Sequence, residues 1–188
     1  MFTLPNLLTA ARLVLTPFVA WRLYQHDVHG AFWLFVAAAV TDLLDGSLAR
    51  LLDQRSVLGA WLDPIADKVM LLTTLTMLAF TDLLPLWLWL LVVVRDIVIL
   101  TGAEAYRRLT GRLDVRPTFS GKIATALEFT LVSFTLADLA LRWGLDRHIA
   151  GLVTATGIAV AFSGFRYVWL WSGKTREFLR QNASRKSS

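Results

Sequence analysis

Residues 42–67 read DLLDGSLARLLDQRSVLGAWLDPIAD, and this stretch carries five aspartates, four of them in two closely spaced pairs. Asp42 and Asp45 lie three residues apart, and Asp63 and Asp67 lie four apart, so on helices each pair shares one face. Two such helices joined by a short loop can direct all four carboxylates at one point. Carboxylates that close repel one another unless protons or cations neutralise them. The stretch therefore predicts a cation site between two helices.

The donor set indicates which cation. An all-carboxylate set suits Mg²⁺, Mn²⁺ or Ca²⁺ rather than Zn²⁺ or copper. Two ions bridged by carboxylates are a recurrent device in phosphoryl chemistry. Small residues share the helix pair, and Arg50 follows one turn after Gly46. Gly46, Ala49 and Gly59 either allow close helix packing or leave room for a flat base and a pyrophosphate that Arg50 grips, and the spacing alone leaves both interpretations open.

The rest of the chain is unusually apolar. Of its 188 residues 56% are hydrophobic, where a soluble domain has about 45–50%. Six segments are long enough to cross about 30 Å of hydrocarbon as helices. We expect an all-α integral membrane bundle with a domain over residues 1–172 and a basic cytoplasmic tail over 173–188, whose last ten residues or so have a disordered composition. The predicted spans are Leu7–Tyr24, Gly30–Ala49, Leu62–Phe80, Leu83–Tyr106, Gly121–Leu141 and Ile149–Trp171.

The basic residues predict the orientation. With six spans, twelve of the 19 Lys and Arg fall in loops and ends on the side shared by both termini, and three fall on the other side. Excess Lys and Arg marks the cytoplasmic side, so both termini are expected in the cytoplasm. The N-terminus resembles neither a removable signal nor a transit peptide. Charge gathered in loops does not suggest a nucleic-acid surface, and the absence of cysteine excludes disulfides and thiolate chemistry.

Ionisable groups also occur inside the predicted spans. Arg12, Lys68, Arg95 and Arg166 join the aspartates there, and each falls toward the cytoplasmic end of its helix. Such groups are costly in lipid and usually face a cavity and one another. Lys and Arg can instead extend to the headgroups, but the short aspartates cannot. We therefore expect a polar cavity open to the cytoplasm.

The motif resembles a known signature. Asp-x-x-Asp-Gly-x-x-Ala-Arg-(x8)-Gly-x-x-x-Asp-x-x-x-Asp is that of the CDP-alcohol phosphatidyltransferases, and residues 42–67 match it without a gap or substitution. The resemblance implies a six-helix homodimeric membrane enzyme that moves a phosphatidyl group from CDP-diacylglycerol to an alcohol and releases CMP. It implies two Mg or Mn ions on the aspartates, with Asp67 also the general base. Gly46, Ala49, Arg50 and Gly59 would line the CDP site.

The acceptor alcohol is less defined. The chain resembles the cardiolipin synthases and the phosphatidylglycerol phosphate synthases over roughly residues 4–130. Glycerol-phosphate enzymes usually carry a second lysine two residues after the one matching Lys122, and here Ala124 stands there. Fewer cations suit phosphatidylglycerol, a diester of one charge, although Arg95, Arg116 and Lys122 could still bind the monoester glycerol 3-phosphate. Phosphatidylglycerol is favoured, and glycerol 3-phosphate remains the alternative.

A non-enzyme interpretation also exists. Intramembrane carboxylates bind coupling ions in transporters, usually near the midplane between inverted repeats. This chain has no evident repeat, and its charges lie at one predicted depth. We therefore expect a multi-pass enzyme of a bacterial cytoplasmic membrane, with the active site facing the cytoplasm and membrane lipid as its surroundings.

Overall fold

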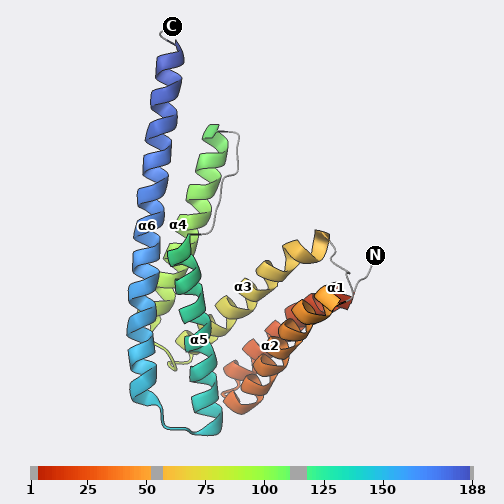
Figure 1. Cartoon of the computed structure of the whole chain (residues 1–188). Helices are drawn as coiled ribbons and strands as arrows, with labels where there is room; N and C mark the ends of the chain where they lie inside the picture. Colours follow the sequence, from red (N-terminus) through yellow and green to blue (C-terminus); the bar gives the residue numbers. More distant parts are fainter. Residues whose placement is uncertain (1–3, 52–56, 111–117, 187–188) are drawn as a thin grey trace. The chain divides into compact units, whose positions relative to one another are not determined.

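The computed structural model describes the backbone of residues 4–51, 57–110 and 118–186, and the side chains of residues 9–41, 62–108 and 118–173. Within these ranges the chain forms six α-helices (Figure 1), which confirms the all-α prediction. The helices are α1 (Leu4–Tyr24), α2 (Val28–Leu51), α3 (Val57–Phe80), α4 (Leu86–Thr110), α5 (Phe119–Leu141) and α6 (Asp146–Lys186).

The helices end close to the predicted positions, with one exception. His26, Asp82 and Arg142 take positive φ just after α1, α3 and α5, the backbone conformation that commonly stops a helix. The exception is α6, which continues to Lys186, so the expectation of a disordered end is wrong through that residue. After Gly173 the sequence has no further Gly or Pro, and it is rich in Lys, Arg, Glu, Leu and Gln, which favour helix.

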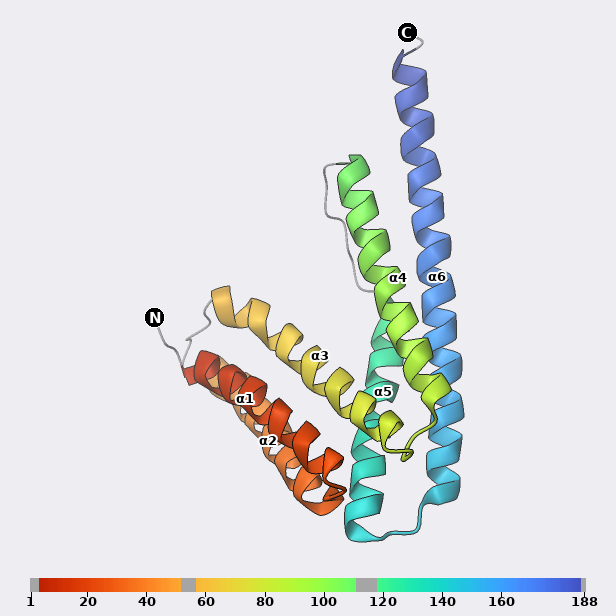
Figure 2. The same ribbon diagram turned by 180° about the vertical axis from the view of Figure 1, so that it is seen from behind.

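The described chain divides into two compact units. The first contains residues 1–86 and 132–149, and in it α1 packs against both α2 and α3 (Figure 2). Side chains such as Val19 and Leu23 of α1, Phe35 of α2 and Leu75 of α3 are almost fully buried. Their burial aligns the three helices that carry the signature and the segment before it.

A polar cap starts α2. The Gly30 amide donates to Asp27 Oδ1 (2.9 Å), and Arg22 donates to Asp27 Oδ2 (2.8 Å). A side-chain oxygen at this position satisfies an amide that has no partner within the helix. The bond from Gly30, and then the neighbouring Arg22, lower the pKa of Asp27 below its ordinary value. The cap therefore favours the ionised form of Asp27.

Replacing Asp27 with alanine is expected to lower the melting temperature by a few degrees, because the first turn of α2 loses its cap. The lowered pKa means that this contribution is complete above the ordinary value of 3.8 and is lost as the pH falls below it. Melting curves of both proteins between pH 7 and pH 3 should therefore converge on acidification. Gln25→Ala, at an exposed neighbour, is the control; a constant difference across this range would contradict the cap.

The second unit contains residues 87–131 and 150–188, that is α4, the first half of α5 and most of α6. Leu88 and Val92 of α4, Leu131 of α5 and Val160 of α6 are buried. At Gly157 of α6 an added Cβ would lie 2.8 Å from the ring of Trp87, so a bare backbone is what lets this ring of α4 approach α6. α4, α6 and the first half of α5 thus pack together as one unit.

Among the residues that the structure describes, three helices are long and apolar enough to cross a membrane: Leu86–Arg108, Phe119–Leu141 and Asp146–Gly173. The last of these carries exposed Ile158, Phe165 and Trp169, as expected of side chains in contact with lipid. In the earlier part of the chain, the described side chains include a shorter apolar helix over Val28–Thr41. Six spans and cytoplasmic termini remain predictions.

Candidate active site

The second aspartate pair of the signature lies at the start of α3. Asp63 and Asp67 are one turn apart on this helix, as their spacing predicts. Each carboxylate contacts a side chain of α1: the Thr9 hydroxyl donates to Asp63 Oδ1, and the Arg12 guanidinium donates to Asp67 Oδ1. The contacting residues are therefore adjacent along one face of α1 and along one face of α3.

Burial differs sharply across the ion pair. The Arg12 side chain is only 2% exposed, whereas that of Asp67 is 53% exposed. An arginine that deep is favourable only when a carboxylate and further acceptors compensate it. The geometry thus places the supporting cation inside the helix bundle and leaves the carboxylate accessible to a substrate or an ion. Donors that hold a metal-binding carboxylate from behind in this way fix its direction toward the ion.

The first aspartate pair lies in a part of the chain described only by its backbone. Asp42 and Asp45 fall within the continuous helix α2, as predicted, but their side chains lie outside the described residues. Among the side chains that the structure describes, no group of three His, Cys, Asp or Glu residues could hold a metal ion. The two aspartates whose side chains are described do fit a hard cation, because their carboxylates lie one turn apart and each accepts a hydrogen bond from a neighbouring donor.

All four predicted CDP-binding residues also lie outside the described side chains. Gly46, Ala49 and Arg50 belong to the last turns of α2, and Gly59 belongs to the first turn of α3. Arg116, predicted to contact the acceptor, lies outside the described residues altogether. The contacts of these five residues therefore stay predictions.

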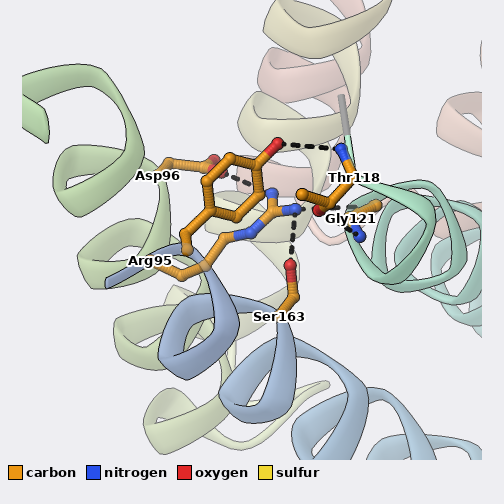
Figure 3. Close-up of polar contacts among 6 residues, drawn as sticks. Arg95, Asp96, Thr118, Gly121 and Ser163 are labelled. Atoms are coloured by element: carbon orange, nitrogen blue, oxygen red, sulfur yellow. Dashed lines mark hydrogen bonds and ion pairs between the residues drawn. The ribbon is translucent and has the colours of Figure 1, made fainter. Parts of the chain in front are cut away.

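A second polar cluster occupies the other unit (Figure 3). Arg95 of α4 is 7% exposed and donates to Asp96 Oδ1 (2.9 Å), Ser163 Oγ (3.2 Å) and the Gly121 carbonyl (3.4 Å). The third predicted acceptor residue, Lys122, follows Gly121 in the first turn of α5, and its side chain is exposed. Two of the three acceptor candidates are thus found on neighbouring elements, but in different environments.

The predictions from sequence did not assign Thr9 and Arg12 to the aspartates. The sequence predicts only that Arg12 faces the same polar cavity as the other charged residues, and it predicts no role for Thr9. A usable signal was present: Thr9 and Arg12 are three residues apart, so they form one helix face that can match the spacing of Asp63 and Asp67. The sequence did not say which helix would meet that face.

Comparison with known proteins identifies the family. The family model for CDP-alcohol phosphatidyltransferase matches residues 2–167, a range that includes both aspartate pairs and the α1 residues that contact Asp63 and Asp67. The chain belongs to the CDP-alcohol phosphatidyltransferase family. Membership in this family confirms the resemblance drawn from residues 42–67, and it favours the enzyme over the transporter.

Curated relatives of this chain carry two names. It is 34% identical to a probable cardiolipin synthase (CMP-forming) of Drosophila melanogaster, over 88% of this chain and 56% of that protein. It is 36% identical to the cardiolipin synthase (CMP-forming) of Streptomyces coelicolor, over 91% and 79%. It is 34% identical to the CDP-diacylglycerol–glycerol-3-phosphate 3-phosphatidyltransferase of Pectobacterium atrosepticum, over 89% and 93%. The alignment thus spans little more than half of the Drosophila protein.

Proposed function

We propose that this protein transfers a phosphatidyl group from CDP-diacylglycerol to an alcohol and releases CMP, with phosphatidylglycerol as the favoured acceptor and cardiolipin as the product. The observation that carries the proposal is the matched pair of contacts from α1 to Asp63 and Asp67 within an unbroken family signature. The names of the relatives support both this reaction and its alternative, in which glycerol 3-phosphate is the acceptor.

In this reaction the residues have distinct tasks. The acceptor hydroxyl oxygen attacks the phosphorus that carries diacylglycerol, and its proton passes to the Asp67 carboxylate. The bond from that phosphorus to the CMP oxygen breaks, and CMP leaves, so no covalent protein intermediate is needed. Arg12 holds the Asp67 carboxylate in place, and Thr9 does the same for Asp63.

Divalent metal belongs to the same proposal. Asp42, Asp45, Asp63 and Asp67 would hold two Mg or Mn ions, which neutralise the pyrophosphate and stabilise departing CMP when bound. Gly46, Ala49, Arg50 and Gly59 would line the CDP site. The residues present fit this chemistry, because hard cations prefer carboxylate oxygens and the described pair is supported from α1.

The remaining proposals concern assembly and location. We place the enzyme in a bacterial cytoplasmic membrane as a six-span homodimer, with both termini and the active site on the cytoplasmic side. The three helices long enough to cross a membrane support the location. The basic residues near the end of α4 support the orientation, because excess positive charge marks the cytoplasmic side.

The choice of acceptor depends on charge. Glycerol 3-phosphate brings a monoester of nearly two negative charges, whereas phosphatidylglycerol brings a diester of one. Ala124, where the glycerol-phosphate enzymes usually have lysine, is fully buried on α5, so a lysine ammonium there would need its own partner. Arg116 and Lys122 are the proposed ligands of the acceptor phosphate, whereas the contacts of Arg95 indicate a different role, which is argued below.

The decisive experiment supplies one acceptor at a time. Labelled CDP-diacylglycerol is incubated with purified protein, Mg²⁺ or Mn²⁺, and either phosphatidylglycerol or glycerol 3-phosphate. Labelled cardiolipin from the first mixture, with little lipid product from the second, is the expected result. Phosphatidylglycerol phosphate from the second mixture alone would assign the alternative acceptor. Product from neither mixture would overturn the proposed reaction.

A further inference from the structure

The first turn of α5 is held by side chains from two other helices. Thr118 lies just before this helix, and its hydroxyl accepts from the Gly121 amide (3.2 Å) while its carbonyl accepts from the Lys122 amide (3.1 Å). Arg95 of α4 donates to the Gly121 carbonyl, and the hydroxyl of Tyr167 on α6 accepts from the Thr118 amide (3.3 Å). The turn is thus fixed at both its amide and its carbonyl groups.

Close packing makes the arrangement specific. A Cβ on Gly121 would lie 3.2 Å from Thr118 Oγ1, 3.3 Å from Arg95 Nη2 and 3.4 Å from the Tyr167 ring. Glycine therefore lets the guanidinium and the tyrosine ring both approach the backbone of α5. In Figure 3 the Arg95 side chain extends toward Ser163 and toward Gly121 in this turn.

The Arg95 guanidinium has little capacity left for a substrate. Nη1 donates to Asp96, Nη2 is shared by Ser163 and the Gly121 carbonyl, and Nε is buried without a hydrogen-bond partner among the described residues. Asp96 itself is only 13% exposed. By contrast, the side chain of Lys122, next to the fixed turn, is exposed. The two cations of this region therefore differ in what they can reach.

We infer that Arg95 is a positioning residue: together with Tyr167 it fixes the first turn of α5, and thereby sets where Lys122 meets the acceptor phosphate, without contacting the acceptor itself. This inference rests on the proposed function of Lys122. A charged donor placed by a rigid turn loses less freedom on binding than one on a loose helix end. Loosening the turn should therefore weaken acceptor binding and leave CDP-diacylglycerol binding unchanged.

The test compares Arg95→Lys and Tyr167→Phe with a matched control. Thr156→Val also removes a hydroxyl of α6 that donates to the α5 backbone, here the Leu127 carbonyl (3.5 Å), but away from the first turn. Acceptor KM and CDP-diacylglycerol KM are measured with the purified full chain in lipid micelles. We expect Arg95→Lys and Tyr167→Phe to raise the acceptor KM about fivefold, as for one lost neutral hydrogen bond, and Thr156→Val to leave it unchanged.

A double-mutant cycle separates positioning from direct contact. If Arg95 acts through the turn, adding Arg95→Lys to Lys122→Met changes the acceptor KM little, because the contact it served is already lost. If Arg95 binds the acceptor directly, the two factors multiply. Multiplying factors, or a Tyr167→Phe protein with the wild-type acceptor KM, would overturn the inference.

A second measurement does not depend on activity. Hydrogen–deuterium exchange of the amides of residues 118–122 should become faster in Arg95→Lys and Tyr167→Phe but not in Thr156→Val. Wild-type protein that releases no CMP with either acceptor would refute the proposed function, while the exchange data would still decide whether Arg95 and Tyr167 fix the turn. Unchanged exchange in both variants would refute the positioning role even in an active enzyme.

Discussion

Replacing Asp67 with alanine is expected to lower CMP release from CDP-diacylglycerol at least about a thousandfold. Asp67 is proposed both to hold metal and to accept the proton of the attacking hydroxyl, so one substitution removes two contributions. Its side chain is half exposed and held by Arg12, which leaves it accessible while fixing its direction. The rate is measured as CMP released by purified protein in lipid micelles with Mg²⁺ or Mn²⁺ at saturating acceptor.

Two further variants define what a loss of activity means. His26→Ala changes an exposed residue in the turn after α1 and should keep the wild-type rate. Asp67→Asn keeps the shape of the side chain and an oxygen for Arg12, but it removes the negative charge, so it too should be inactive. An active Asp67→Asn protein would reduce Asp67 to a structural role, and an active Asp67→Ala protein would refute both proposed roles.

The sequence predicted the helices well because their signals are local. Apolar runs of about 20 residues separated by short polar breaks define such helices almost by composition alone. The end of α6 differs from the prediction because a charged, polar segment after an apolar run has the composition of a tail, although its residues are good helix formers. Hydropathy finds where a span ends, but helix propensity decides where the helix ends.

The site was predictable only in part, since contacts between distant segments leave weaker traces in one sequence. The spacing of Asp63 and Asp67 gave their shared face, but nothing local indicated that Thr9 and Arg12 would meet them across more than fifty residues. The sequence predicts that Arg95 binds the acceptor, whereas its contacts indicate that it supports the first turn of α5. A charged residue in an apolar span predicts that a partner exists, but the tertiary structure determines which residue that partner is.

Replacing Arg12 with methionine is expected to lower kcat about 10- to 100-fold, the usual cost of losing a hydrogen-bond partner that orients a metal-binding or catalytic side chain. Methionine has a similar length and suits a buried position, so the change tests the ion pair more than the packing. Removing one partner of a buried pair is severe when the other charge stays buried, but Asp67 is 53% exposed and water can replace the guanidinium. The melting temperature should therefore fall only slightly, even though kcat falls strongly.

The matched control is Arg22→Met on the same helix. Arg22 also pairs with an aspartate, Asp27, but the pair lies at the surface, where ion pairs contribute little, so kcat should not change.

Thr9→Val provides a milder test at the adjacent contact, because it keeps the side-chain shape and removes only the hydroxyl that reaches Asp63; a fall in kcat of about fivefold is expected. If Arg12→Met and Thr9→Val both keep the wild-type kcat in folded protein, the aspartates do not depend on α1 for their orientation. If Arg12→Met unfolds but Thr9→Val shows its expected loss, orientation from α1 still holds, because the second variant leaves the buried charge and its ion pair intact.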